Sequence, residues 1–188
     1  RFPAAPDECL AATRWLQAQA GALGLDASRF AVGGDSAGGN LAAVVSLALR
    51  GELPLAFQLL IYPATDQHRT HESHRRNAQG YLLTADTMTW FHDHYITDPA
   101  LDDDWRASPL RHPDLAGLPP ALVLTAGYDP LRDEGIAYAQ RLSESGVRAT
   151  LLSFERQIHG FMPMGRVIDE ANEAVALCAD ALRRALRA

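Results

Sequence analysis

Residues 32–40 read VGGDSAGGN and place four glycines and one serine between two apolar segments. The preceding letters, RFAV, are typical of a short strand. The following letters, LAAVVSLALR, are typical of a helix that is apolar on nearly all sides and therefore buried. The central GDSAG matches G-x-S-x-G, in which a strand turns sharply into a helix with the serine at the apex. We therefore predict a strand–turn–helix unit that presents Ser36.

The turn around Ser36 explains the glycines. Side chains at Gly34 and Gly38, two residues to either side, are expected to collide with neighbouring segments, and Asp35 completes the turn. The start of the helix lets the Ala37 amide point at a developing oxyanion. Taken alone, the motif is also compatible with a phosphate-binding loop or a plain turn.

Three further apolar segments predict strands that alternate with helices. The predicted strands after the first are residues 57–63, 121–127 and 149–155, and the predicted helices are residues 7–23, 37–50, 133–145 and 168–186. This alternation implies right-handed crossovers and an α/β fold, with about four parallel strands flanked by helices on both faces. We expect residues 1–188 to form one domain.

Residues 67–118 interrupt this pattern, because they are polar, histidine-rich and longer than a crossover requires. The letters LTADTMTWFHDHYI within them predict a helix with Thr84 as its N-cap. We expect this segment to be a cap or lid insertion at the carboxyl edge of the sheet, where ligands bind in open α/β folds. Trp90, Phe91 and Tyr95 are expected to form the core of this cap, with a pocket wall as the alternative.

A serine hydroxyl needs a base, held by a third group, to become a nucleophile. Of the seven histidines, His159 alone follows a predicted strand closely, in QIHGF. Asp129 follows the strand 121–127 directly and is the predicted acid. Asp133 is the alternative, although acidic residues in a first helical turn also have a structural explanation. The order Ser36, Asp129, His159 is the order of α/β-hydrolases.

The spacing of His68, His71 and His74 suggests a metal site at first sight. No strand or helix signal brings their nitrogens together, and a closed site needs a fourth ligand, so we interpret them as a solvated loop. The three aspartates at residues 102–104 lack the spaced ligands and the glycine of a calcium loop. We predict no metal and no cofactor.

Composition excludes several classes of protein. The formal net charge of −6 argues against a nucleic-acid-binding face. The longest apolar run, residues 41–49, is too short to span a bilayer. Cys9 and Cys178 lie far apart and are interpreted as small buried hydrophobes in a reducing, cytoplasmic compartment.

The linked motifs GDSAGGN, LLIYP, DWRASPL, LPPALVLTAGYDPLRDEG, YAQRL and IHGF resemble the bacterial hormone-sensitive-lipase family of carboxylesterases. The resemblance covers essentially the whole chain. It implies an α/β-hydrolase fold and hydrolysis of carboxylic esters with short to medium acyl chains. It also implies that Ser36 is the nucleophile, Asp129 the acid, His159 the base and the Ala37 amide one oxyanion donor.

The resemblance further implies a glycine-rich HGGG loop that completes the oxyanion hole, and this loop is not in the sequence. The 188 residues are similar to the C-terminal three-fifths of such an enzyme. We therefore expect this segment by itself to be inactive or nearly so, and poorly soluble because of an open sheet edge. Homodimerisation through the last strand and helix is implied by the family alone.

Four side chains are predicted to line an acyl or alcohol pocket, with packing as the alternative for each: Tyr62, Tyr81, Phe161 and Met162. Two alternative functions remain open. One is another serine hydrolase, an amidase or peptidase. The other is a ligand-binding protein on the same scaffold, similar to the plant gibberellin receptors, which lack the catalytic histidine. The presence of His159 argues for an enzyme.

Overall fold

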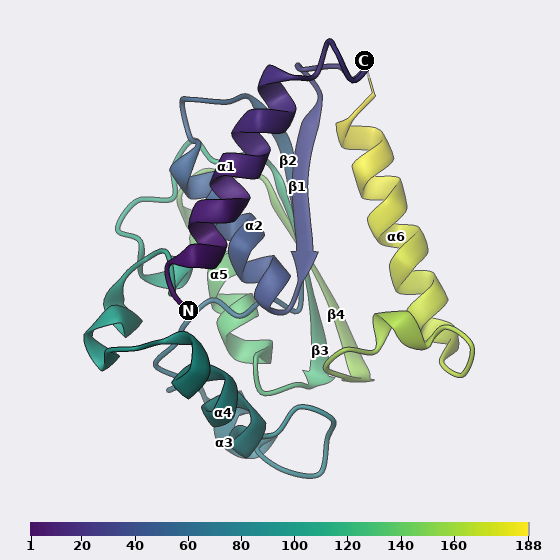
Figure 1. Ribbon diagram of the computed structural model, residues 1–188. Coiled ribbons are helices and arrows are strands. Elements are labelled where there is room, and N and C mark those ends of the chain that lie inside the picture. Colours follow the sequence, from purple (N-terminus) through teal and green to yellow (C-terminus); the bar gives the residue numbers. More distant parts are fainter. Residues whose placement is uncertain (188) are drawn as a thin grey trace.

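A four-stranded sheet forms the centre of the computed structural model, which describes residues 1–187 (Figure 1). The sheet order is β1-β2-β3-β4, and all three pairings are parallel. The strands are β1 (Phe30–Asp35), β2 (Leu55–Ile61), β3 (Ala121–Tyr128) and β4 (Ala149–Ile158). The predicted parallel sheet of four strands is therefore confirmed.

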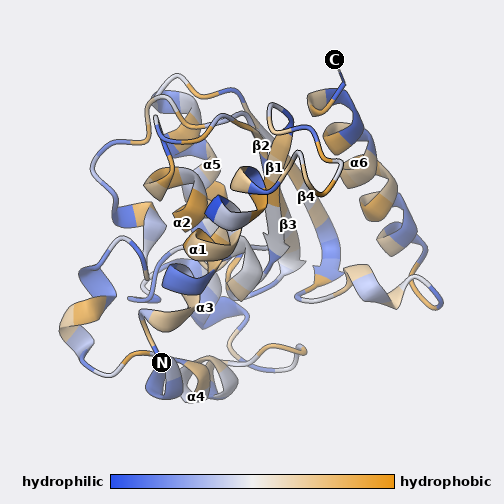
Figure 2. Ribbon diagram, turned by 45° about the horizontal axis from the view of Figure 1, so that its top comes forward, coloured by the Kyte–Doolittle hydropathy of each residue, from blue (hydrophilic) through white to orange (hydrophobic). Residues whose placement is uncertain are grey.

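Helices cover both faces of the sheet, as the alternating pattern predicts. One face carries α1 (Ala4–Ala18), α2 (Ala37–Ala48) and α5 (Arg132–Glu144), whereas the other carries α6 (Asp169–Ala185). Figure 1 shows α6 standing on the opposite side of the strands from α1 and α2. In Figure 2, α6 carries blue and orange bands in turn, the mark of a helix with one buried face.

The strands divide their side chains between two cores because successive residues point to opposite faces. Leu60 and Val123 pack with α2 and α5, while Leu59 and Leu122 pack with α6. Seven consecutive residues of α2, from 42 to 48, include six that are buried, as the apolar sequence predicts. The sheet is thus covered on both faces, which explains the continuous apolar runs in β2 and β3.

The segment between β2 and β3 holds two helices and two short 3₁₀ turns. These are α3 (Glu72–Arg76), α4 (Ala85–Tyr95), η1 (Pro99–Asp103) and η2 (Pro109–Arg111), and a third turn, η3 (Met162–Met164), follows β4. The N–H of Thr87 donates to Thr84 Oγ1 at 3.2 Å, which confirms the predicted N-cap. In Figure 1, α3 and α4 lie beyond the carboxyl ends of the strands.

The first helix begins and ends earlier than its sequence predicts, at Ala4–Ala18 rather than residues 7–23. Its start is anchored by Phe2, which is buried, donates its N–H to Tyr95 O at 2.9 Å and packs edge-on against the Tyr95 ring. Its end precedes a turn closed by the Leu25 N–H, which donates to Ala20 O at 2.8 Å. The start of the helix is therefore set by contacts with the distant Tyr95, and its end by a local turn.

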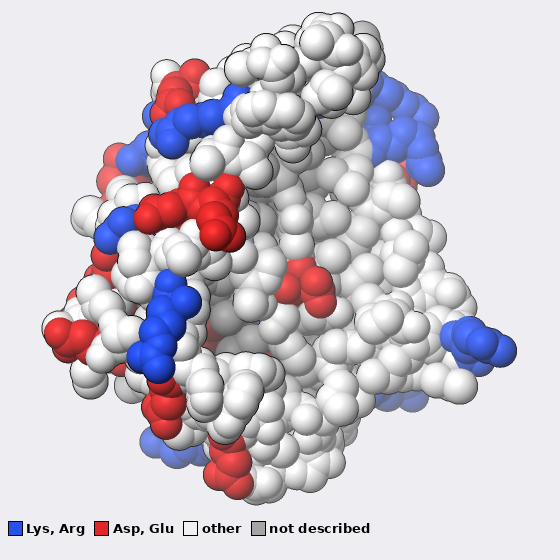
Figure 3. Space-filling model, in the orientation of Figure 1, with Lys and Arg blue, Asp and Glu red and all other residues white. Residues whose placement is uncertain are grey.

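The surface shows no dominant charged patch in the view of Figure 3. Acidic and basic side chains alternate over the left half of this face, an acidic group lies near its middle, and mainly basic groups lie at its right edge. Cys9 is partly exposed, Cys178 is buried, and both are free thiols. In the part of the chain that the structure describes, no helix has the length and apolar character needed to cross a membrane.

Leu60 tests the importance of the central strand. Leu60→Ala is expected to lower the free energy of unfolding by about 2–5 kcal/mol, because Leu60 is fully buried and its loss leaves a cavity. The exposed Leu23→Ala is the control and should change stability by less than about 0.5 kcal/mol. Urea denaturation measures both values, and equal effects would contradict the packing described above.

Candidate active site

Ser36 stands at the junction of β1 and α2 in a backbone conformation that non-glycine residues rarely adopt. Its φ is 55° and its ψ is −117°, so the predicted strained turn is present. The Ser36 N–H donates to Ile61 O at 2.9 Å, and Ser36 O accepts from the N–H of Asn40 at 3.1 Å. These bonds to β2 and to the first turn of α2 hold the strained residue in place.

The glycines around Ser36 have different reasons for being glycine. A Cβ on Gly34 would lie 2.4 Å from the carbonyl carbon of Gly38, and one on Gly39 would lie 2.8 Å from Pro63 Cβ. A Cβ on Gly38 would meet nothing closer than Asp35 Oδ1 at 4.0 Å. The expectation of a collision at Gly38 is therefore wrong, because a Cβ at this position would make no close contact with any residue that the structure describes. The steric requirement falls on Gly34 and Gly39.

The structure brings together the three residues that the sequence singles out. His159 Nε2 lies 3.0 Å from Ser36 Oγ, and His159 Nδ1 lies 2.7 Å from Asp129 Oδ2. The second oxygen of Asp129 accepts the Leu131 N–H at 2.8 Å, which fixes the rotation of the carboxylate. Asp129 is fully buried, so its charge acts on the imidazole with little screening by water.

The alternative acid, Asp133, has other partners. Its carboxylate receives a hydrogen bond from Arg132 at 2.7 Å and another from the Ser73 N–H at 2.9 Å. Desolvation opposes these contacts, but together with the charge of nearby Arg76 they lower the pKa of Asp133. Asp133 therefore serves the start of α5, as its place in a first helical turn suggests.

Strand register explains why Asp129 and His159 meet. Tyr128 in β3 and Ile158 in β4 are pairing partners, after an irregularity between Ala126 and Tyr128. Asp129 and His159 follow these partners directly in the sequence, so parallel pairing delivers both to the same edge of the sheet. Ser36 follows β1 at that same edge.

The predicted pocket residues behave differently from expectation. Tyr62 and Phe161 are buried in the core beside α6, and the Tyr62 ring packs on His159 with 4.8 Å between ring centroids. Met162 is partly buried against the same core, and Tyr81 stacks on Tyr128. None of the four is among the side chains that line the cavity at Ser36. For Phe161 and Met162 the reason is that the chain after His159 turns into the core. Packing, the alternative, describes their contacts.

Tyr62 supports the base without taking part in proton exchange near neutral pH. Burial, reinforced by the carboxylates of Asp35 and Asp129, raises the pKa of Tyr62 to about 12. The phenol therefore stays neutral and presents a rigid ring to the imidazole of His159. This contact limits how far the imidazole can tilt away from Ser36.

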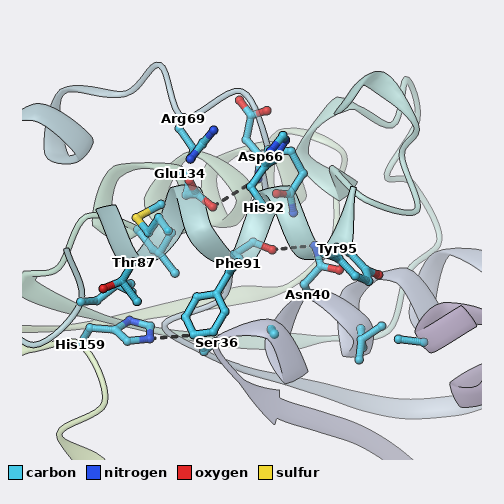
Figure 4. Close-up of a pocket in the computed structure, with 18 of the residues that line it drawn as sticks. Ser36, Asn40, Asp66, Arg69, Thr87, Phe91, His92, Tyr95, Glu134 and His159 are labelled. Atoms are coloured by element: carbon cyan, nitrogen blue, oxygen red, sulfur yellow. Dashed lines mark hydrogen bonds between the residues drawn. The ribbon is translucent and has the colours of Figure 1, made fainter. Parts of the chain in front are cut away.

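A cavity of about 630 Å³ opens on Ser36 and His159, and most of its wall is apolar. Figure 4 shows His159 pointing at Ser36, with the residues of α4 lying across the cavity. The sequence analysis missed most of this wall, which comes from α1, the loop after β2 and the 67–118 segment: Ala5, Ala64, Asp66, Arg69, Leu82, Leu83, Thr87, Met88 and His92.

Helix α4 presents one face to this cavity. Thr87, Phe91 and Tyr95 recur every four residues and all line it, whereas Trp90 is largely exposed. The expectation that Trp90, Phe91 and Tyr95 form a cap core is therefore wrong for Trp90 and Phe91, which are both exposed. The alternative, a pocket wall, describes Phe91 and Tyr95. The four-residue spacing was visible in the sequence, but the direction in which this face points was not.

Each of the clustered histidines lies near a carboxylate, and the rings of His71 and His74 also pack with 6.0 Å between their centroids. The interpretation as a solvated loop is wrong for His74, which is buried in α3. His68 Nε2 lies 2.9 Å from Asp103, His74 Nε2 lies 2.8 Å from Glu134, and His71 lies 3.8 Å from Asp66. Glu134 is fully buried, and this burial raises the pKa of its carboxyl group, although His74 and two backbone N–H groups oppose the shift. No group of three or more potential ligands with metal-site geometry occurs among residues 1–187.

With this geometry established, comparison with known proteins is informative. A model of the family described as "alpha/beta hydrolase fold" matches residues 1–163. The chain belongs to this α/β-hydrolase family. The resemblance inferred from the motifs is thereby confirmed at the level of family and fold.

Several relatives are esterases by name. The chain is 44% identical over 189 residues to an ethyl acetate hydrolase of Pseudomonas putida and 40% identical over 192 residues to the carboxylesterase NlhH of Mycobacterium tuberculosis. These alignments cover 99% and 100% of this chain, but 59% and 60% of those proteins. The chain thus spans about three-fifths of the length of these relatives.

Solved structures share the fold of this chain. EstE1, a thermophilic carboxylesterase cloned from a metagenomic library, superposes with a TM-score of 0.97 at 42% identity, over 100% of this chain and 65% of EstE1. An α/β-hydrolase from the metagenome of Lake Arreo gives a TM-score of 0.93 at 47% identity, over 97% of this chain and 58% of its own. This chain therefore shares its fold and its family with these proteins.

The two glycines flanking Ser36 provide a matched test of the turn. Gly34→Ala is expected to lower the unfolding free energy by about 1–3 kcal/mol or more, because its Cβ collides with backbone. Gly38→Ala should keep or slightly raise stability, since alanine favours a helix by up to about 1 kcal/mol over glycine. Thermal denaturation of both variants checks this, and equal destabilisation would contradict the assignment of the close contact to Gly34.

Proposed function

We propose that the protein hydrolyses carboxylic esters with short to medium acyl chains through a covalent acyl-enzyme. The observation that supports this most is the hydrogen-bonded row Ser36–His159–Asp129 at the mouth of an apolar cavity. The names of the relatives, an ethyl acetate hydrolase and a carboxylesterase, support the substrate class.

In the proposed first step, Ser36 Oγ attacks the ester carbonyl while His159 Nε2 takes its proton. Asp129 holds Nδ1 and stabilises the imidazolium that forms. The negative charge on the carbonyl oxygen is stabilised by the N–H of Ala37, which lines the cavity and, as the first residue of α2, has no acceptor within the helix. His159 then gives its proton to the leaving alcohol.

In the second step, water attacks the acyl-enzyme. His159 takes a proton from the water, the bond between the acyl carbon and Ser36 Oγ breaks, and the proton returns to Ser36. The carboxylic acid leaves and the free enzyme is restored. The nucleophile, the base, the acid and one oxyanion donor of these two steps belong to this chain, and the remaining oxyanion donors would come from an HGGG loop that its sequence does not contain. The proposed mechanism uses no cofactor.

Residues 67–118 are proposed to act as a cap within the single domain of residues 1–188. Support comes from their position beyond the carboxyl ends of the strands and from the many cavity-lining side chains that they contribute. Thr87 and Phe91 of α4 lie opposite Ser36 in this cavity (Figure 4). The acyl or alcohol chain of the ester would contact this apolar wall.

Two features outside the site support further proposals. Among residues 1–187, β4 pairs only with β3 and is therefore an edge strand. Three apolar side chains on this side are exposed, Leu151 of β4 and Val175 and Leu177 of α6. The open edge and these side chains support a homodimer through this side. The free thiols Cys9 and Cys178 support a reducing, cytoplasmic environment.

Replacement of the three central residues tests the proposed chemistry. In a protein that also carries the HGGG loop, Ser36→Ala and His159→Ala are each expected to lower kcat for p-nitrophenyl acetate by about 10⁴-fold or more, and Asp129→Asn by about 10⁴-fold. Ser143→Ala is a matched control, because its hydroxyl only donates to Ala139 O on α5. Activity that survives Ser36→Ala at the wild-type level would refute the mechanism.

Matched substrates separate the ester hydrolase from an amidase or peptidase. We expect kcat/KM to be higher for an ester than for the amide with the same acyl group and a leaving group of similar size. Steady-state kinetics with both compounds gives the ratio. A ratio below one would favour the amidase, and tight binding of the ester without turnover would favour a ligand-binding protein.

A further inference from the structure

We propose that α3, the five-residue helix in the 67–118 segment, is a clamp that positions Asp129 for its contact with His159. The effects on kcat given below rest on the proposed function, whereas the position of Asp129 is argued from hydrogen bonds alone. The side chains that form the clamp are Ser73 and His74 of α3 and Asn77 directly after it, and all three are buried.

Asn77 holds the backbone on both sides of Tyr128. Its side-chain Nδ2 donates to Asp129 O at 3.0 Å and to Gly127 O at 3.2 Å. The chain is irregular here, since the pairing of β3 with β4 shifts between Ala126 and Tyr128. The ladder resumes at Tyr128, directly before Asp129, and the amide of Asn77 adds a second restraint across this irregular stretch.

Ser73 holds the chain just after Asp129. Its hydroxyl donates to Pro130 O at 2.6 Å and accepts the Asp133 N–H at 3.1 Å, while its own N–H donates to Asp133 Oδ2 at 2.9 Å. Pro130 has no N–H of its own, and the turn is closed by the Arg132 N–H, which donates to Asp129 O at 3.2 Å, together with these bonds to Ser73. The clamp thus reaches the acid loop before and after Asp129.

The third member of the clamp links the loop to the cavity wall. His74 Nε2 lies 2.8 Å from Oε2 of Glu134, whose other oxygen accepts the N–H groups of Thr65 at 2.5 Å and Asp66 at 3.2 Å. Glu134 and Asp66 both line the cavity. The same short helix therefore fixes the acid loop, the start of α5 and the loop after β2 against one another.

The geometry that depends on the clamp is narrow. Asp129 Oδ2 must lie 2.7 Å from His159 Nδ1 while Oδ1 keeps the Leu131 N–H. A displacement of the backbone by about 1 Å breaks one of these bonds, and misplacements of this size cost up to about 100-fold in rate. Asn77, Ser73 and His74 are positioning residues, because they act on Asp129 and its loop and have no contact with the reacting atoms.

The experiment compares Asn77→Ala and the isosteric Asn77→Asp, which loses the donor, with the same changes at Asn172. Asn172 Nδ2 also donates to a backbone carbonyl, Gly165 O at 2.8 Å, but on the exposed side of α6. Both Asn77 variants should lower kcat for p-nitrophenyl acetate by about 10- to 100-fold with KM within about twofold. Both Asn172 variants should leave kcat unchanged.

A second readout does not depend on turnover. The proton on His159 Nδ1, held by Asp129, should give a downfield NMR resonance in the wild-type protein and in the Asn172 variants. This resonance should move upfield or disappear in both Asn77 variants. Absence of turnover in a wild-type protein that also carries the HGGG loop would count against the proposed function, while the resonance would still decide on the clamp.

Circular dichroism establishes that each variant is folded. If neither Asn77 variant folds, Ser73→Ala becomes the deciding variant, because it removes a different contact of the clamp and leaves Asn77 in place. It should weaken the resonance and lower kcat, as expected for the Asn77 variants. Folded Asn77 variants that keep both the resonance and kcat would overturn the proposal. Ser73→Ala with wild-type values would do the same where it is the deciding variant.

Discussion

The parallel register between β3 and β4 is the constraint on which the site depends. Because Tyr128 pairs with Ile158, the next residue of each strand leaves the sheet at the same level, and these residues are Asp129 and His159. A slip of two residues would separate their side chains by about 7 Å along the strand, well beyond hydrogen-bond reach. The side chains of β3 are buried in the cores on both faces of the sheet, so a shift of this strand would disturb close packing on both sides.

The turn at Ser36 depends on a second kind of constraint, which is backbone against backbone. Gly34 packs against Gly38, and Gly39 packs against Pro63 at the end of β2, so the first turn of α2 lies directly on the sheet edge. Bonds from Ser36 to Ile61 and Asn40 hold its unusual φ of 55°. A strained residue persists when its surroundings over-determine it, and here they bring its hydroxyl to His159.

The sequence was most informative where a signal is local. Strand and helix order, the Thr84 cap and the residues that follow each strand could be predicted, because apolar period, capping chemistry and chain order act over a few residues. The parallel arrangement then followed from general topology. Asp129 and Asp133 were four residues apart and chemically alike, so their different roles became visible only through their partners.

Features that depend on distant contacts escaped prediction. The cavity wall comes from a segment whose direction is set by tertiary packing, so Phe91 and Arg69 could not be assigned to it from local pattern. Tyr62 and Phe161 follow strand ends and the base, yet they turn into the core. The clamp made by Ser73 and Asn77 joins residues more than fifty positions apart, and no sequence spacing announces it.

The central claim is that His159 and Asp129 make Ser36 a nucleophile. Reaction of the protein with a serine-directed phosphonate, followed by proteolysis and mass spectrometry of the peptides, tests it most directly. The predicted result is a single covalent adduct on Ser36, formed far more slowly after His159→Ala. An adduct on a different residue, or labelling of Ser36 at the same rate without His159, would contradict the account.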